Sequence, residues 1–188
     1  CLGRKIYRGI KQNKKQSVRQ GLSRICYKEK KMEKQLKYNE PWILQRADPY
    51  VYRHTDGTYY FTASVPEYDR IVLRSASHLA DLADAEEHEV WHKHESGPQS
   101  IHIWAPELHY IAGRWYVFYA GSEDKENNWA FDCHVLVCDS NDPYTGTWSE
   151  KGKFQKREED DFSFTGFSLD MTYFEDGERS YVIWAQHS

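Results

Sequence analysis

The chain lacks the apolar stretches that export or membrane insertion would require. Its first 38 residues contain no run of the ~7–15 apolar residues that forms the centre of a secretory signal. Nowhere does the 188-residue sequence hold the ~20 consecutive apolar residues of a transmembrane helix. These absences predict a cytoplasmic protein with no membrane partner.

Cysteine is scarce, with four in the chain. Cys133 and Cys138 lie five positions apart, and no His or Cys pair at zinc-finger spacing accompanies them. We therefore expect reduced thiols, as in a cytoplasmic protein, and no metal ligands among these residues.

Acidic residues are nearly absent from residues 1–38, which hold 13 Lys and Arg against 2 Asp and Glu. Residues 39–188 hold 12 Lys and Arg against 27 Asp and Glu, so their net charge is about −15. This negative charge disfavours nucleic acid as a partner. The basic segment has no periodic apolar face, begins with Cys1 and reaches its first methionine at Met32. We predict that residues 1–38 are a disordered or non-native leader, that Met32 is the natural start and that residues 39–188 form the folded domain. A genuine basic tail is the alternative.

Aromatic residues are abundant, with 14 Tyr, 7 Trp and 8 Phe. Such residues favour β-strands, and they also pack against the flat apolar faces of sugars. Composition alone leaves both uses open.

The sequence repeats itself three times. The segments are "ADPYVYRHTDGTYYFTAS" from Ala47, "APELHYIAGRWYVFYAGS" from Ala105 and "LDMTYFEDGERSYVIWAQ" from Leu169. Each has an acidic residue near its start, a Gly-containing turn and an apolar strand-like run, and an Asp-Gly turn between strands predicts a type I′ hairpin. The acidic residues are Asp48, Glu107 and Asp170.

The spacing of the repeats predicts a β-propeller. The three acids are 59 and 63 positions apart, and each interval holds a further strand candidate, 70–77 or 133–140, before a tryptophan. A unit of about 60 residues with four short strands is typical of one propeller blade. We therefore predict an all-β protein with about two and a half blades present, whose acids converge on one cavity. Three ordinary hairpins are the alternative, and "HEVWHKH" (88–94) is expected to be a solvated loop.

Four segments together resemble glycoside hydrolase family 43, five-bladed β-propeller enzymes that cleave arabinosides and xylosides. The segments are "RADPYVYR", "LRSASHLADL", "IWAPELHYIAGRWYVFYA" and "GFSLDMTYFEDG", and the resemblance covers residues 39–188. The Trp-Ala-Pro-Glu-Leu-His version is most similar to α-L-arabinofuranosidase members. The resemblance implies an N-terminal fragment with blades 1, 2 and part of blade 3.

The resemblance also implies roles for two acids. Asp48 matches the general base that activates water, and Asp170 matches the aspartate that orients the general acid and raises its pKa. The general acid is a Glu of a later blade and is absent from this chain, so the 188 residues alone are expected to be inactive. Inverting hydrolysis needs such a base and acid ~6.5–9.5 Å apart.

Three further residues are candidates for sugar binding: Trp104, Glu107 and Phe167. Core packing is the alternative for both aromatic residues, and a structural role is the alternative for Glu107. The sequence requires no cofactor, and the resemblance implies a possible structural cation in the channel of the full-length protein.

The predicted function is removal of terminal α-L-arabinofuranosyl residues from arabinan or arabinoxylan oligosaccharides. A β-xylosidase of the same family and a non-catalytic carbohydrate-binding propeller are the alternatives. A protein-interaction propeller of the WD kind is disfavoured, because its Gly-His and Trp-Asp signatures are absent. The expected partners are arabinose- or xylose-containing oligosaccharides.

Overall fold

The computed structural model describes residues 41–123, 125–127 and 130–187. The chain divides into two units, Cys1–Lys37 and Tyr38–Ser188, and the described residues all belong to the second. The predicted leader, with Met32 as the natural start, lies outside the described residues.

These residues form ten strands and one 3-10 helix. The first group is β1 (Ala47–Arg53), β2 (Tyr59–Ser64), β3 (Arg70–Ala76), η1 (Leu79–Ala83) and β4 (His88–His92). The second group is β5 (Ile101–Ile111), β6 (Arg114–Ser122), β7 (Asp132–Cys138) and β8 (Trp148–Lys153). The last two strands are β9 (Ser168–Asp176) and β10 (Arg179–Gln186).

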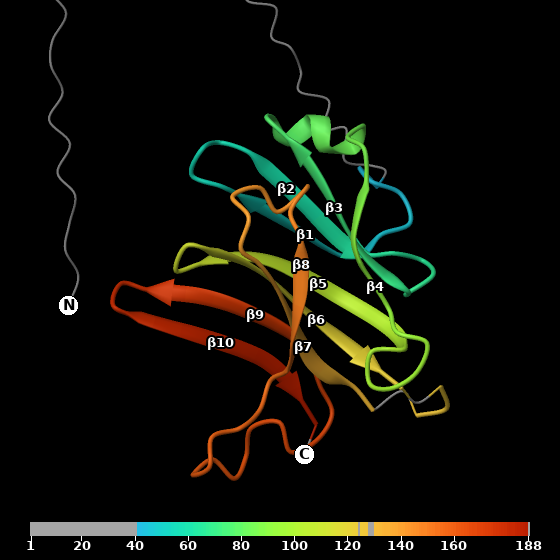
Figure 1. Ribbon diagram of the computed structural model, residues 1–188, viewed down its shortest axis with the longest axis vertical. Coiled ribbons are helices and arrows are strands. Elements are labelled where there is room, and N and C mark those ends of the chain that lie inside the picture. Colours follow the sequence, from blue (N-terminus) through green and yellow to red (C-terminus); the bar gives the residue numbers. More distant parts are fainter. Residues whose placement is uncertain (1–40, 124, 128–129, 188) are drawn as a thin grey trace, which may run out of the picture. The chain divides into compact units, whose positions relative to one another are not determined.

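The strands form three antiparallel sheets whose order in space follows the chain (Figure 1). Strands β1 to β4 make one four-stranded sheet, β5 to β8 make a second, and β9 pairs with β10. The first strands of successive sheets pack together, β1 against β5 and β5 against β9. This radial stacking of meandering sheets is the architecture of a propeller. The prediction of an all-β propeller with about two and a half blades is confirmed.

The first two sheets share one hydrophobic core. In β2 every residue from Tyr60 to Ser64 is buried, because the second sheet covers one face and η1 covers the other. Trp115 of β6 is fully buried in this core, and its indole Nε1 donates to the carbonyl of Asn141 over 3.1 Å. Burying one large apolar side chain contributes ~1.5–3 kcal/mol, so the core holds the inner strands at fixed positions.

The three hairpin turns differ, although each contains glycine. Ala112 and Gly113 have φ angles of 48° and 85°, as a type I′ turn requires. In the first hairpin only Gly57 has a positive φ, 95°, and its N–H donates to the carbonyl of His54 over 3.0 Å. The third hairpin has its positive φ at Gly177. The type I′ prediction is therefore wrong for the Asp-Gly pairs. The first loop is longer, since Arg53 pairs with Tyr59, and in the third loop glycine stands at the first of the two positions and Glu178 has no positive φ.

The segment expected to be a loop at 88–94 is largely a strand. Residues His88–His92 form β4, the outer strand of the first sheet. Val90 and Trp91 are half-buried and pack against the core, while the indole Nε1 of Trp91 donates to Glu150 over 2.8 Å. The loop prediction is wrong because two apolar contacts outweigh the polar histidines around them.

An ion cluster fixes the entry to β1. Both carboxylate oxygens of Glu87 accept hydrogen bonds from Nη2 of Arg46, at 2.8 and 2.7 Å, and Nε of Arg74 donates to Oε2 over 3.2 Å. Burial alone would raise the pKa of Glu87, but the hydrogen bonds and charges of the two arginines outweigh it and lower that pKa. Arg46 lies two residues before Asp48, so the cluster anchors the start of this strand.

Glu87→Gln in the full-length protein is expected to lower the free energy of unfolding at pH 7 by about 1–2 kcal/mol, since it leaves two half-buried guanidinium groups without a countercharge. Because the folded pKa is lowered, this stabilisation is complete above about pH 4.3. It disappears as the pH falls through the folded pKa. Thermal unfolding of both proteins at several pH values measures the difference. Glu89→Gln is the control, since its carboxylate is 49% exposed and 3.9 Å from Arg70; an equal loss in both variants would contradict the prediction.

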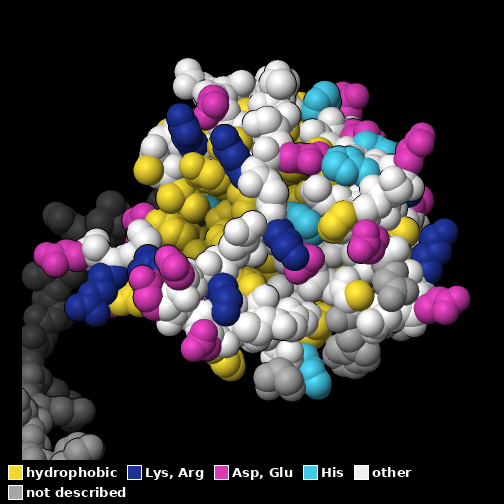
Figure 2. Space-filling model, turned by 60° about the horizontal axis from the view of Figure 1, so that its bottom comes forward, with side chains coloured by type: hydrophobic (Ala, Val, Ile, Leu, Met, Phe, Trp, Pro, Cys, Tyr) yellow, Lys and Arg dark blue, Asp and Glu magenta, His cyan; other side chains and the backbone are white. Residues whose placement is uncertain are grey.

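Hydrophobic side chains gather in one region of the face drawn in Figure 2, with lysine and arginine side chains beside it. Among the described residues, β10 has only β9 as a strand neighbour. Phe162 and Ile183, close to this edge, expose 66% and 53% of their surface. An open edge of this kind is where a propeller adds its next strand.

Candidate active site

Two adjoining hollows lie where the inner strands of the three sheets meet. Their volumes are about 340 and 240 Å³, and Asp48, Ala105 and Asp170 line both. Trp104 lines the larger hollow and Glu107 lines the smaller. The fold thus brings four of the five predicted site residues together from β1, β5 and β9.

The backbone takes the same unusual conformation at three equivalent places. Asp48, Ala105 and Asp170 have φ angles of 51°, 46° and 52°, in the left-handed region that costs a non-glycine residue about 1–2 kcal/mol. The strand pairing shifts next to all three: between Ala47 and Tyr50, on both sides of Trp104, and between Ile183 and Ala185 opposite Asp170. Such bulges re-aim side chains, and here the two aspartates point into the shared hollow that they line.

Glu107 does not occupy the place of the two aspartates. The residue of the second repeat that shares their conformation is Ala105, and Glu107 follows two positions later, as Tyr50 follows Asp48. The expectation of one acid at the same place in each repeat holds for Asp48 and Asp170 and is wrong for Glu107. Glu107 still lines the same hollow, since residues two apart on a strand share a face.

The acids of the hollow influence one another electrostatically. The pKa of Asp170 is raised by partial burial first, and then by the negative charges of Asp48 and Glu107. Burial and the same Glu107 charge raise the pKa of Tyr50 to about 12, with Tyr52 contributing. The hollow is therefore a region of negative potential in which protonation of a carboxyl group is favoured.

A buried histidine, His109, contacts the Glu107 carboxylate. His109 is 3% exposed, and its Nε2 lies 3.2 Å from Oε2 of Glu107, without the angular geometry of a hydrogen bond. Its Nδ1 lies 3.4 Å from the hydroxyl of Tyr50. These contacts link β1 to β5 and fix the side chain of Glu107 beside the aspartates.

Asp48 accepts a hydrogen bond from a residue of the neighbouring strand. The Oγ of Ser64 donates to Oδ2 of Asp48 over 3.0 Å. The backbone N–H of Ala105 in turn donates to the same Oγ over 2.8 Å. Ser64 therefore connects the aspartate of the first sheet to the left-handed alanine of the second.

Trp104 belongs to an aromatic cluster at the wall of the larger hollow. Its ring centroid lies 5.1 Å from His102, 4.4 Å from Phe131 and 5.7 Å from Tyr68. His102 and Phe131 are only 5.8 Å apart, so they do not sandwich the indole, and Trp104 can present a face to the hollow. Its Nε1 is buried and has no acceptor among the described residues.

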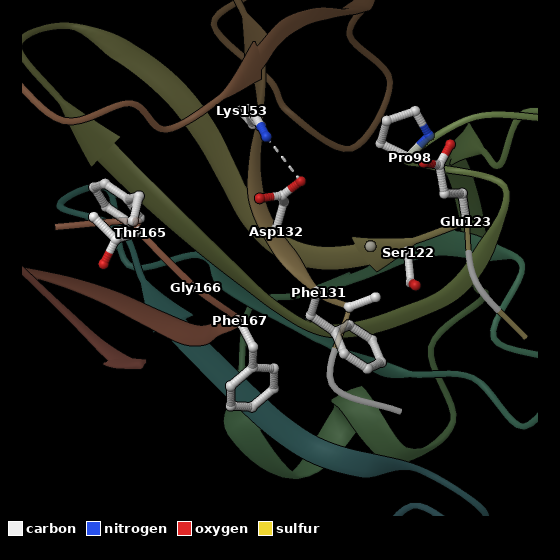
Figure 3. Close-up of a pocket in the computed structure, with 12 residues that line it drawn as sticks. Pro98, Ser122, Glu123, Phe131, Asp132, Lys153, Thr165, Gly166 and Phe167 are labelled. Carbon is white, nitrogen blue, oxygen red and sulfur yellow. Dashed lines mark hydrogen bonds and ion pairs between the residues drawn. The ribbon is translucent and has the colours of Figure 1, made fainter. Parts of the chain in front are cut away.

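Phe167 lies at a different hollow from the acids. This hollow, of about 480 Å³, is lined by Phe131, the Asp132–Lys153 ion pair and the loop before β9 that carries Phe167. In Figure 3 the ion pair lies on one side, and the rings of Phe131 and Phe167 lie on another. Phe131 stacks on Trp104 and also contacts Phe167, at 6.2 Å between centroids. The two hollows therefore share one aromatic wall.

Comparison with known proteins decides the family. Residues 38–188 match the family described as glycosyl hydrolases family 43. The chain belongs to this family.

Family 43 relatives match the chain over most of its length. An extracellular exo-α-(1→5)-L-arabinofuranosidase of Streptomyces chartreusis is 47% identical over 150 residues, which cover 80% of this chain and 44% of the relative. A protein of the same name from Streptomyces avermitilis is 45% identical over 151 residues, or 80% of this chain and 30% of the relative. The crystal structure of an α-L-arabinofuranosidase from Lactobacillus brevis has 43% identity and a TM-score of 0.73, over 79% of this chain and 46% of that one. The chain therefore spans less than half the length of these relatives.

The comparisons overturn the predicted location. Both Streptomyces relatives are named extracellular, so the prediction of a cytoplasmic protein is wrong. It rested on the absence of an apolar leader, and such an absence does not determine where a protein acts. Among the described residues, no helix is both long and apolar enough to cross a membrane.

Several residues of the site were not found from the sequence. Ser64 contacts Asp48, Tyr50 lines the smaller hollow, and Tyr68 lines the larger one. Tyr68 lies between β2 and β3 and has a φ of 52°, which no local pattern announces. The two prolines could have shown the correct alignment of the repeats. Asp48 precedes Pro49 and Ala105 precedes Pro106, so matching the prolines aligns Asp48 with Ala105.

The described residues do not by themselves form a cation site. They contain no group of three or more His, Cys, Asp or Glu side chains that could hold a metal ion. The cation in the channel of the full-length protein stays a prediction.

Proposed function

We propose that the full-length protein is an inverting α-L-arabinofuranosidase that removes terminal arabinofuranosyl residues from arabinan or arabinoxylan oligosaccharides. The observation that carries the proposal is the convergence of Asp48 and Asp170 on one hollow, from the inner strands of the first and third blades. The names of the 45–47% identical relatives support arabinose over xylose as the sugar.

In this mechanism Asp48 is the general base. Its carboxylate takes a proton from water as the oxygen attacks the anomeric carbon, and the leaving oxygen departs on the opposite face of the ring. Asp48 fits this role because it is solvent-accessible at the hollow and its carboxylate accepts a hydrogen bond from Ser64 that orients it.

Asp170 does not exchange a proton with the substrate. It acts on the general acid, by raising the pKa of that acid. A carboxylate beside a carboxylic acid raises the pKa of that acid, which then stays protonated near neutral pH. The raised pKa of Asp170 itself, caused by burial and by Asp48 and Glu107, supports a site in which negative charges repel strongly. The general acid belongs to a later blade, and no residue described in this chain is assigned that role.

The sugar ring would lie against Trp104, within reach of Glu107. The half-buried indole offers an apolar face, and the Glu107 carboxylate can accept from a sugar hydroxyl. This combination of one aromatic surface and few polar groups is typical of small-ligand sites.

The proposal is tested by hydrolysis of 4-nitrophenyl α-L-arabinofuranoside and 4-nitrophenyl β-D-xylopyranoside by the full-length protein, with proton NMR of the first sugar released. We expect arabinose of inverted anomeric configuration and a higher kcat/KM for the arabinoside. Preference for the xyloside would favour a β-xylosidase. Sugar binding without any hydrolysis would favour the non-catalytic alternative.

Phe167 is predicted to contact the part of an oligosaccharide beyond the cleaved residue, since its hollow shares an aromatic wall with the acidic one. Loss of one sugar–ring contact is expected to raise KM about 5–10-fold. Phe167→Ala should therefore raise KM for α-(1→5)-arabinotriose by that factor and change KM for the aryl arabinofuranoside less than about twofold. Phe162→Ala is the control, because Phe162 lines another hollow. Equal changes with both substrates would show that Phe167 only packs.

A further inference from the structure

Ser64 is a buried residue whose hydroxyl has two assigned neighbours. It is 2% exposed and ends β2, opposite Ala47 in the register with β1. Its Oγ lies 3.0 Å from Oδ2 of Asp48 and 2.8 Å from the backbone nitrogen of Ala105. The bulge between Ala47 and Tyr50 turns Asp48 back over this hydroxyl.

The direction of these hydrogen bonds follows from the chemistry of the groups. A backbone N–H can only donate, so Ala105 uses an acceptor position of Oγ. Ser64 then has a single proton, and the neighbouring oxygen that can accept it is the Asp48 carboxylate. The Ala105 N–H therefore donates to Ser64, and the Ser64 hydroxyl donates to the Asp48 carboxylate, which acts only as an acceptor.

We infer that Ser64 is a positioning residue that holds Asp48 as an ionised base with one chosen oxygen facing the water. Oδ2 is engaged by Ser64, while Oδ1 has no hydrogen-bond partner among the described residues. Oδ1 is therefore the oxygen that takes the proton. This inference rests on the proposed function and adds a residue that acts through Asp48.

The second sheet controls this arrangement through its backbone. Ala105 adopts its left-handed φ of 46° at the point where its N–H reaches Ser64, so docking of β5 beside β2 orients the base on β1. The charged groups that face Asp48 from the other strands are Asp170 on β9 and Glu107 on β5. Among these neighbours, Ser64 is the group that donates a hydrogen bond to Asp48.

Ser64→Ala in the full-length protein is expected to lower kcat on 4-nitrophenyl α-L-arabinofuranoside about tenfold, with KM changed less than twofold, because one charge-assisted hydrogen bond is lost. The donor stabilises the ionised carboxylate, so its loss makes protonation easier. The acidic limb of the kcat/KM profile should therefore move to higher pH, by about one unit. An unmoved limb would overturn the inference.

Two further variants separate positioning from folding. Ser64→Cys keeps a weak donor and acceptor at the same place and should shift the limb by an intermediate amount. Thr62→Val is the matched control, since Thr62 lies on the same strand and its buried Oγ1 has no hydrogen-bond partner among the described residues. Its limb should stay at the wild-type pH, and a limb shift in Thr62→Val equal to that in Ser64→Ala would also overturn the inference.

Failure of this inference differs from failure of the proposed function. A wild-type protein that hydrolyses no arabinoside would refute the proposed function. An active wild type whose acidic limb is unmoved in the Ser64→Ala variant would refute only the role of Ser64. Because Ser64→Ala also leaves the Ala105 N–H without its acceptor, a lower melting temperature alone would support neither outcome, and the pH profile decides.

Discussion

Asp48→Asn in the full-length protein is expected to lower kcat by about 10²–10⁴-fold, the usual contribution of a general base. The amide keeps the size of the carboxylate but cannot take a proton from water. The fold should persist, because asparagine tolerates the positive φ of 51° at this position and its amide oxygen can still accept from Ser64. Steady-state hydrolysis of an aryl arabinofuranoside, with a thermal melt of the same samples, measures both effects.

A matched control is Asp56→Asn, in the turn that joins β1 to β2. The Asp56 carboxylate accepts from the backbone N–H of Thr58 over 2.8 Å and lines neither acidic hollow. We expect wild-type turnover in this variant. Wild-type turnover in Asp48→Asn would show that another group is the base.

Asp170→Asn is expected to act on protonation of the leaving group. Removal of its negative charge lowers the pKa of the nearby general acid, so the protonated acid is lost at lower pH. The alkaline limb of the pH–rate profile should move to lower pH. Turnover of arabino-oligosaccharides, whose leaving groups need a proton, should fall about 100-fold, and turnover of 4-nitrophenyl arabinofuranoside should fall less.

The comparison of leaving groups makes this prediction specific. Asp176→Asn, at the far end of β9, serves as the control, because Asp176 is exposed and lines neither hollow. An unchanged alkaline limb, together with equal losses for good and poor leaving groups, would argue against the role of Asp170.

Much of the fold was predictable from the sequence because the propeller is built from local units. Each blade is a meander of strands that neighbour one another in the chain, so apolar runs and glycine turns were sufficient to locate them. The strands around Arg70 and Cys133 were found in this way. The strand at His88 was missed, since its burial depends on contacts of Val90 and Trp91 with the shared core.

The candidate site was likewise predictable only in part from the sequence. Asp48 and Asp170 stand at the start of inner strands, where the sequence pattern placed them. Glu107 was aligned with them wrongly, because only the backbone dihedrals reveal that Ala105 takes the left-handed position. Phe167 is near Asp170 in the chain, yet side chains alternate along an extended segment, and the two residues line different hollows.

The sequence by itself therefore determined the all-β class, the repeated blade and the two aspartates at equivalent strand starts, because these depend on local periodicity and turn chemistry. Only the tertiary structure decided which side chains surround the aspartates. Ser64 reaches Asp48 across paired strands, and Ala105 reaches Ser64 from the next sheet, 41 residues along the chain. Such contacts depend on how the sheets pack, on strand register and on bulges, and no local pattern in the sequence encodes those distances.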